Sequence, residues 1–285
     1  MITVTTLVNT SPQKVWKYWT HPFHITKWNA ASDDWHCPHA ENDLRPGGHF
    51  TSRMEAKDGS MGFDFTGVYD AVEENQLIEY TMADGRKARV EFIDENGQTR
   101  IVESFDPESE NSHELQQQGW QAILDNFSKY AAGLTLKKIQ FEYFINTTPE
   151  RVYQLMLAPD TYQKWTAAFN PGSHYRGSWD EGTAIHFVGT DEQGNEGGMV
   201  SRIQKNIPAS CVCIEHLGIL QDGKEVLDGP EIEIWKGVME CYYFLPSGTG
   251  TNLKVEMDTI QSFDAYFLET WPKALEILKG ICEEG

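Results

Sequence analysis

The sequence is poor in the features that mark secreted, membrane-spanning or disulfide-rich proteins. It has five cysteines, an odd number, which lie far apart except for Cys211 and Cys213. No apolar run approaches the roughly 18 residues of a membrane span. The first residues show neither the basic segment nor the apolar segment of a secretory signal peptide. These absences predict a cytoplasmic protein whose thiols are reduced and buried.

Basic residues are scarce relative to acidic ones. The chain has 23 Lys and Arg against 43 Asp and Glu, which gives a formal net charge of −20. Residues 1–133 hold 11 basic and 21 acidic side chains, and residues 134–285 hold 12 and 22, so each half carries a charge of −10. Such a field repels phosphate backbones and anionic lipids. We therefore expect no nucleic acid as a partner, and no membrane span.

Established catalytic and metal-binding motifs are also missing. There is no Gly-x-Ser-x-Gly, no His-Glu-x-x-His and no Cys/His pair at a known spacing. His36 and His39 flank a Cys-Pro pair, but residues three apart on a strand point to opposite faces. The Arg45–Gly48 segment lacks the Lys-Ser/Thr of a phosphate loop, and Cys211 and Cys213 lack two further ligands. The sequence predicts no metal and no cofactor.

The most informative feature present is an internal repeat. Residues 146–153 (NTTPERVY) repeat residues 9–16 (NTSPQKVW) 137 positions later, and Trp165 follows Trp28 at the same offset. Near the ends, Trp271 follows Trp120 at an offset of 151. One unit written twice predicts two domains, 1–133 and 137–285. The larger second offset indicates inserted residues, which we place in the polar segment Leu220–Glu233.

The order of expected elements is the same in both copies. A strand is followed by two short helices, about six strands and one long helix, which ends the first copy over Ser112–Ala132. In the second copy Ser262 is expected to cap the final helix, and Pro272 to kink it or set its start. The pattern predicts an α+β fold of two tandem domains. In each, a curved antiparallel sheet of about seven strands wraps around the long C-terminal helix and leaves a space that can hold a small molecule.

Several motifs give this layout a family resemblance. They are Ser11-Pro12-x-x-Val15-Trp16, Asp43-Leu44-Arg45-Pro46-Gly47-Gly48, Phe65-x-Gly67-x-Tyr69 and Gly119-Trp120-x-x-x-Leu124. Together they resemble the helix-grip superfamily, which includes START lipid-transfer domains, birch-pollen-allergen-like proteins and polyketide cyclases and is often abbreviated SRPBCC. The first copy resembles bacterial relatives of the C-terminal domain of the activator of heat-shock-protein-90 ATPase. The second copy lacks the paired glycines and resembles the superfamily more broadly. The resemblance implies a helix-grip fold with a cavity and leaves the ligand open.

Large side chains at mid-strand and helix positions are the candidate ligand-binding residues. In the first copy they are Trp28, Phe50, Met54, Phe65, Tyr69, Tyr80, Trp120, Leu124 and Phe127. In the second copy they are Trp165, Ile185, Phe187, Met199, His216, Met239, Tyr243, Trp271 and Leu275. We expect the first copy to hold the more open cavity, because Ile185, Phe187 and Trp235 are bulky and should fill the second.

Two polar residues are candidates for acid–base chemistry inside a cavity. Glu103 lies on an alternating strand face that is otherwise mostly apolar, and burial would raise the pKa of its carboxyl. The competing interpretation is an ion pair with Arg53 or Arg89, or a position in water beside Arg100. His216 shares a face with an isoleucine two residues before it, which also fits a core histidine with one hydrogen bond.

The leading hypothesis is a non-catalytic protein that binds a small hydrophobic or amphipathic ligand, with a role in stress response. The alternatives are a cyclase- or hydrolase-like enzyme that uses Glu103 or His216 with a tyrosine, and a chaperone-associated interaction protein. A homodimer is also expected, with the second copy acting as a dimerising or shielding module.

Overall fold

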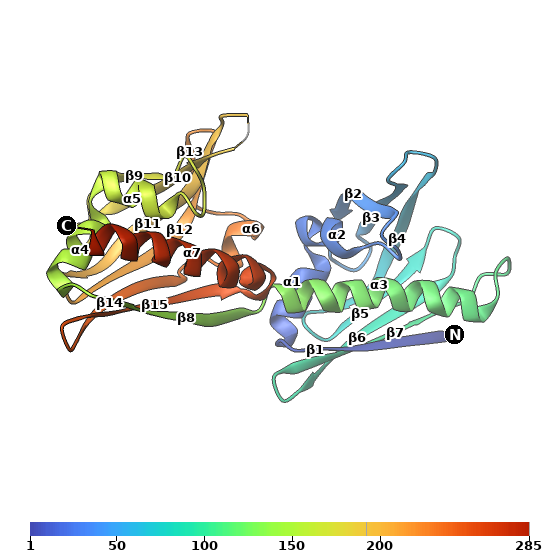
Figure 1. The fold of residues 1–285 in the computed structure, drawn as a ribbon. Helices are drawn as coiled ribbons and strands as arrows, with labels where there is room; N and C mark the ends of the chain where they lie inside the picture. The colour runs from blue at the N-terminus through green and yellow to red at the C-terminus, as the bar shows by residue number, and fades with distance from the viewer. Residues whose placement is uncertain (192, 285) are drawn as a thin grey trace. The chain divides into compact units, whose positions relative to one another are not determined.

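The computed structural model describes residues 1–191 and 193–284. The chain divides into two compact units, Met1–Thr135 and a second that begins at Leu136 (Figure 1). Each unit is an α+β arrangement of one curved antiparallel sheet with a long helix at its C-terminal end, as the sequence predicts. Among the described residues no helix combines the length and the apolar character needed to cross a membrane.

The first unit builds a seven-stranded sheet around its final helix. Its elements are β1 (Ile2–Val8), α1 (Pro12–Thr20), α2 (Pro22–Trp28), β2 (Trp35–Asn42), β3 (His49–Ala56), β4 (Gly62–Glu73), β5 (Leu77–Met82), β6 (Lys87–Glu95), β7 (Gln98–Phe105) and α3 (His113–Gly133). The strand order β1-β7-β6-β5-β4-β3-β2 is a meander in which β7 returns to pair with β1. The side chain of Ser112 caps α3 by accepting a hydrogen bond from the Leu115 amide.

The second unit repeats this plan with an eight-stranded sheet. Its elements are β8 (Leu136–Ile145), α4 (Pro149–Leu157), α5 (Pro159–Thr166), β9 (His174–Gly177), β10 (Ala184–Thr190), β11 (Glu196–Ile207), β12 (Cys211–Gln221), β13 (Lys224–Val226), α6 (Pro230–Glu233), β14 (Met239–Ser247), β15 (Gly250–Ile260), the 3₁₀ turn Gln261–Phe263 and α7 (Asp264–Glu283). The order β8-β15-β14-β12-β11-β10-β9 matches the first sheet strand for strand, and β13 pairs with β12 outside that path.

The inserted residues lie where the sequence places them. Between β5 and β6 the first unit has only residues 83–86, whereas residues 222–238 separate β12 from β14 and contain β13 and α6. The predicted segment Leu220–Glu233 therefore falls on the additional hairpin and helix.

The repeated tryptophans hold the two short helices in the same way in both units. The indole Nε1 of Trp28 donates to the Tyr18 carbonyl at 3.0 Å, and that of Trp165 donates to the Met156 carbonyl at 2.9 Å. Because a buried indole N–H needs a partner, each bond ties the second short helix to the end of the first. The motif shared by the two copies thus has a structural role.

The start of the final helix differs from the prediction. Ser262 lies in the 3₁₀ turn, and Phe263 occupies the N-cap position of α7 without a side-chain cap. Pro272 lies inside α7 and neither starts nor ends it. A proline lacks one backbone donor, so α7 loses a hydrogen bond at this point, although the helix continues through it.

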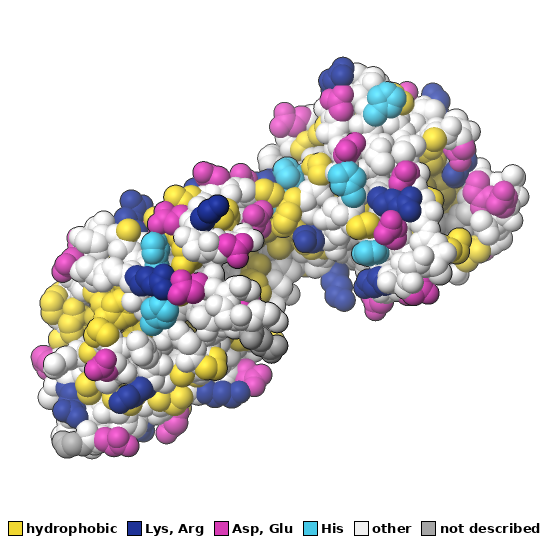
Figure 2. All heavy atoms as spheres, turned by 90° about the horizontal axis from the view of Figure 1, so that it is seen from above, with side chains coloured by type: hydrophobic (Ala, Val, Ile, Leu, Met, Phe, Trp, Pro, Cys, Tyr) yellow, Lys and Arg dark blue, Asp and Glu magenta, His cyan; other side chains and the backbone are white. Residues whose placement is uncertain are grey.

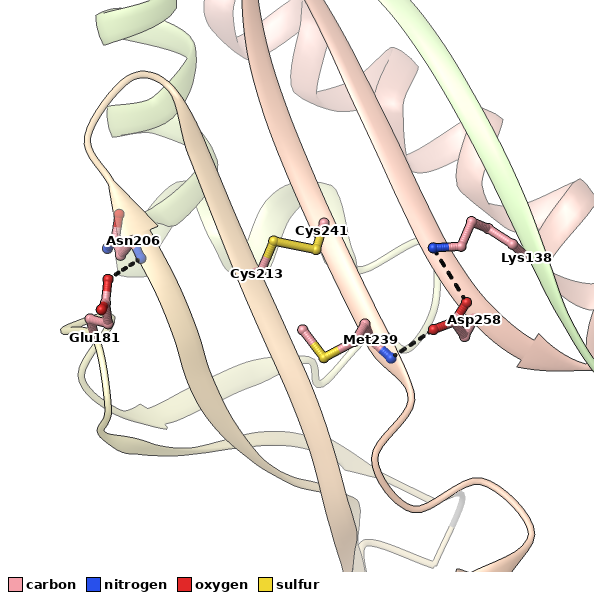
Figure 3. The surroundings of a disulfide bond; sticks show 7 residues. All are labelled: Lys138, Glu181, Asn206, Cys213, Met239, Cys241 and Asp258. Carbon is pink, nitrogen blue, oxygen red and sulfur yellow. Dashed lines mark hydrogen bonds and ion pairs between the residues drawn. A yellow bond between two sulfur atoms is a disulfide. The ribbon is translucent and has the colours of Figure 1, made fainter.

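The prediction that all thiols are reduced is wrong for one pair. Cys213 on β12 and Cys241 on β14 form a disulfide across directly opposed strand positions (Figure 3). The other cysteines, Cys37, Cys211 and Cys282, are free and buried. The pair is 28 residues apart in sequence, so only the strand register brings the two sulfurs together. It lies on the sheet face opposite to the face that carries His216 and Tyr242, because strand positions of opposite parity point to opposite sides.

Candidate functional site

The first unit encloses a cavity of about 310 Å³ between the concave face of its sheet and α3. Its wall combines aromatic side chains with aliphatic and polar ones. The predicted residues that line it are Trp28, Phe50, Met54, Phe65, Tyr69, Tyr80 and Trp120. The predicted residues Leu124 and Phe127 lie elsewhere, because both are fully buried in the core. A cavity lined by aromatic rings and a few polar groups is the usual form of a small-molecule site.

Glu103 is the buried polar centre of this cavity. It lies on β7, lines the cavity and is 5% exposed. Desolvation by burial raises the pKa of its carboxyl to about 8, while a hydrogen bond with the Tyr80 side chain acts in the opposite direction. Burial, the charge of Glu103 and the hydrogen bond with it all raise the pKa of the Tyr80 phenol. At neutral pH the pair therefore offers a carboxylic acid and a phenol to a ligand.

The expected ion pairs of Glu103 are not formed. Arg53 pairs with Glu55 and Asp64, Arg89 pairs with Glu79 and Glu91, and Arg100 pairs with Glu95. The strand register explains why. Val90 is the residue opposite Glu103 on β6, so the neighbouring Arg89 points to the other face of the sheet.

The other polar residues that line the first cavity are Asn29, Glu41, Ser52, Tyr69 and Arg86. The Tyr69 hydroxyl donates to the side-chain oxygen of Asn42 at 2.8 Å, and burial raises the pKa of this phenol. Arg86 lines the cavity, but its Nε is bound to Asp84 and its Nη1 donates to the Asp106 carbonyl at 3.2 Å. These bonds fix the guanidinium at the edge.

The second unit has the larger cavity, with a volume of about 830 Å³. This reverses the expected order, in which the first copy was to be the more open. Phe187 lines the space and leaves it open, while Ile185 packs in the core at 1% exposure. The predicted residues Trp165, Met199, His216 and Trp271 also line this cavity.

The remaining predicted residues of the second unit lie outside its cavity. Ile185 and Leu275 belong to the hydrophobic core. Tyr243 packs on the outer sheet face, where the Lys254 ammonium lies 5.9 Å from its ring centroid. Met239 begins β14, where its backbone amide donates to Asp258 at 3.2 Å (Figure 3).

His216 has two polar partners in the larger cavity. Its Nδ1 lies 2.9 Å from the Ser201 hydroxyl oxygen, and its Nε2 lies 3.6 Å from Oε2 of Glu240. Glu240 in turn accepts a hydrogen bond from the Tyr242 hydroxyl. Ser201 is fully buried and does not line the cavity, so it can orient the imidazole but cannot reach a substrate as a nucleophile.

Sequence reasoning missed Glu240 and Ser201. The alternation Glu240-x-Tyr242-x-Phe244 on β14 placed a carboxyl on the inward face and was a usable signal. Ser201 gave no such signal. A register shift between Val200 and Ser201 sets Ser201 directly opposite His216, and such a bulge is visible only in the structure.

The histidine-rich segment of the first copy does not gather ligands for a metal. His36 lies 3.9 Å from Glu55, and His39 lies 3.2 Å from Glu41. Within residues 1–191 and 193–284 no group of three or more His, Cys, Asp or Glu side chains is placed to hold a metal ion.

The fold and the sheet–helix cavities define a tandem helix-grip protein. The family model of the activator of Hsp90 ATPase homolog 1-like proteins matches residues 9–132. The AHSA1-like protein from Aeromonas hydrophila is 43% identical, with 45% of this chain and 91% of that chain covered and a TM-score of 0.43. Protein Chr148 from Cytophaga hutchinsonii is 60% identical, with coverages of 45% and 90% and a TM-score of 0.42. The chain belongs to the family of AHSA1-like proteins.

One solved structure spans both units. The di-domain ARO/CYC StfQ from the steffimycin biosynthetic pathway covers 99% of this chain and 98% of its own, at 12% identity and a TM-score of 0.37. At this level of similarity nothing about its activity is transferred to this chain. No protein with a curated function matches the sequence.

Proposed function

We propose that the first unit binds a small apolar or amphipathic molecule that carries one hydrogen-bonding group. The observation that supports this most directly is the cavity of about 310 Å³, in which Glu103 and Tyr80 lie among aromatic and aliphatic side chains. Glu103 and Tyr80 hydrogen-bond to each other, and a ligand carbonyl or hydroxyl could pair with the hydrogen-bonding capacity that this contact leaves. The aromatic rings contribute apolar contact area.

The predicted ligand has a flat apolar body and a neutral polar end. With the pKa of Glu103 at about 8, the carboxyl is protonated at pH 7 and can donate its O–H to a ligand carbonyl. An anionic head group is disfavoured, because the net charge of residues 1–133 is −10 and the nearest guanidinium, that of Arg86, is already bound.

Binding of a matched pair of probes to the full chain tests this proposal. We expect 2-acetylnaphthalene to bind with saturable stoichiometry at pH 7, and 2-isopropenylnaphthalene, which replaces the carbonyl by an alkene of similar shape, to bind more weakly by about ten-fold. Met54→Trp should fill the first cavity and abolish binding, whereas the matched variant Met199→Trp in the second unit should leave it unchanged. Equal affinity for both probes, or binding that Met54→Trp leaves intact, would contradict the proposal.

Acid–base catalysis at the same cavity is a second candidate function. It is favoured by one observation, the pKa of Glu103 at about 8, since general acids and bases work best near the ambient pH. Exchange of the methyl protons of 2-acetylnaphthalene with D₂O measures proton abstraction next to a carbonyl. If the wild type accelerates this exchange and Glu103→Gln does not, the result would support catalysis. If neither protein accelerates the exchange, the result would support binding without catalysis.

A further inference from the structure

The larger cavity, in the second unit, has a charge pattern that the first lacks. Its described lining residues include no lysine and no arginine, while Asp191, Asp222 and Glu240 are among them. Arg176 pairs with Glu196 at the same cavity and so neutralises that carboxyl. In the first unit, by contrast, Arg86 lines the cavity and the pKa of the buried carboxyl is raised. The two cavities therefore suit ligands of different charge.

Glu240 is a largely buried carboxyl that lines this larger cavity. Its side chain is 15% exposed, one oxygen accepts the Tyr242 hydroxyl, and the other lies 3.6 Å from His216 Nε2. Among the described residues His216 is the only basic side chain within ion-pair distance of it. A carboxyl removed from water without a lysine or arginine partner is stabilised by a cation that reaches it from the cavity.

Aromatic side chains line the same cavity as this carboxyl. The ring centroids of Tyr162 and Trp165 lie 5.3 Å apart, those of Trp165 and Trp271 6.1 Å, and those of Tyr242 and Trp271 6.2 Å. Phe187 also belongs to this group, and its ring centroid lies 6.1 Å from that of Tyr162. Faces of aromatic rings attract cations, and rings arranged around a space are suited to an ammonium group.

We propose that the cavity of the second unit binds an organic cation, an amine or quaternary ammonium attached to an apolar body. Glu240 supplies the counter-charge, and Tyr162, Trp165, Phe187, Tyr242 and Trp271 supply the ring faces. The volume of about 830 Å³ leaves room for the apolar part of such a ligand beyond the cation. The net charge of −10 on residues 134–285 favours the approach of a cation from solution. This site is separate from the first cavity and does not depend on the function proposed there.

An isosteric probe pair isolates the contribution of charge. Isothermal titration of the full chain compares benzyltrimethylammonium with neopentylbenzene, in which carbon replaces the quaternary nitrogen. We expect one saturable site that prefers the cation by about ten-fold or more. Glu240→Gln, which preserves shape, should remove that preference. Glu256→Gln changes a carboxyl on the outer face of the same sheet and should leave it unchanged.

A second variant keeps the test decisive if Glu240→Gln does not fold. Phe187→Leu removes one ring face and should weaken binding of the cation several-fold while affecting the neutral isostere less. Equal or tighter binding of neopentylbenzene to the wild type would overturn the proposal. So would a cation preference that persists in folded Glu240→Gln or, where that variant is unfolded, a preference in folded Phe187→Leu that is as large as in the wild type.

Discussion

Glu103 and Glu240 show how the same residue type acquires different chemistry from its neighbours. Glu103 is enclosed by aromatic rings with Tyr80 as its partner, and burial raises the pKa of its carboxyl. Glu240 shares its cavity with His216 and Tyr242. The alternation of the strands made Glu103 and His216 candidates for inward positions, with an ion pair or a solvent position as the alternative for Glu103. It did not predict their partners, because Tyr80 and Ser201 come from other strands whose register depends on bulges and loop lengths.

The raised pKa of Glu103 has a consequence for stability that can be measured. Between the ordinary pKa of 4.5 and about 8, the folded chain retains a proton that the unfolded chain releases. The contribution of Glu103 to the free energy of unfolding therefore falls as pH rises through this window, by on the order of a few kcal/mol. Glu103→Gln should lose less stability than the wild type between pH 5 and pH 8.5 in denaturant unfolding.

Glu91→Gln is the matched control, since Glu91 lies on the outer face of the adjacent strand and pairs with Arg89. It should retain the wild-type dependence on pH. Parallel pH profiles for the wild type and Glu103→Gln would show that the buried carboxyl is ionised throughout.

At the scale of elements, the order of strands and helices was predictable because its signals are local. Proline after Ser11 and Thr148 opens the short helices, and alternating strands bounded by turn residues follow. The start of α7 was not predictable in the same way. Ser262 is a good capping residue by type, but the chain enters α7 through a 3₁₀ turn. The capping preference of Ser262 is therefore overridden by the path that the chain takes from β15 into the helix.

An equivalent tryptophan holds the long helix of each unit to its sheet. The two tryptophans differ in how deeply they are buried. Trp271 is 2% exposed and its indole donates to the Met257 sulfur at 3.0 Å. Trp120 stacks on Phe105 at a centroid distance of 3.9 Å but also lines the cavity. We expect Trp271→Ala to destabilise its unit by about 3–5 kcal/mol and Trp120→Ala to cost less. Denaturant midpoints measure both, and a larger loss for Trp120→Ala would contradict this assignment.

At the scale of the whole molecule, the duplication could be predicted from the sequence. The repeated motifs lie near the start and the end of each unit, where they hold the short helices and the long helix in place. The sequence did not allow us to predict which of the two cavities is larger. It depends on the directions of individual side chains, such as Ile185 into the core and Phe187 along the cavity. The face of the molecule in Figure 2 does not mark either cavity by charge, since acidic and basic side chains are interspersed on it. The expected homodimer stays a prediction.

Independent folding of the first unit is the prediction at this scale. Only Leu134 and Thr135 separate α3 from β8, and the first compact unit ends at Thr135. We propose that residues 1–133 fold alone, as the repeat predicts. A fragment of these residues should show one cooperative thermal transition by circular dichroism. A gradual loss of signal without a transition would mean that the unit needs the rest of the chain.

The central claim, that Glu103 recognises a neutral polar group in the first cavity, is tested most directly by the pH dependence of probe binding. The affinity of the full chain for 2-acetylnaphthalene is measured from pH 6 to pH 9.5, for the wild type and for Glu103→Gln. The pKa of about 8 predicts an affinity that is constant up to about pH 7 and falls as the carboxyl loses its proton, whereas Glu103→Gln, whose amide remains a donor, should show no such fall. No saturable binding at any pH, or the same pH profile in both proteins, would contradict the account.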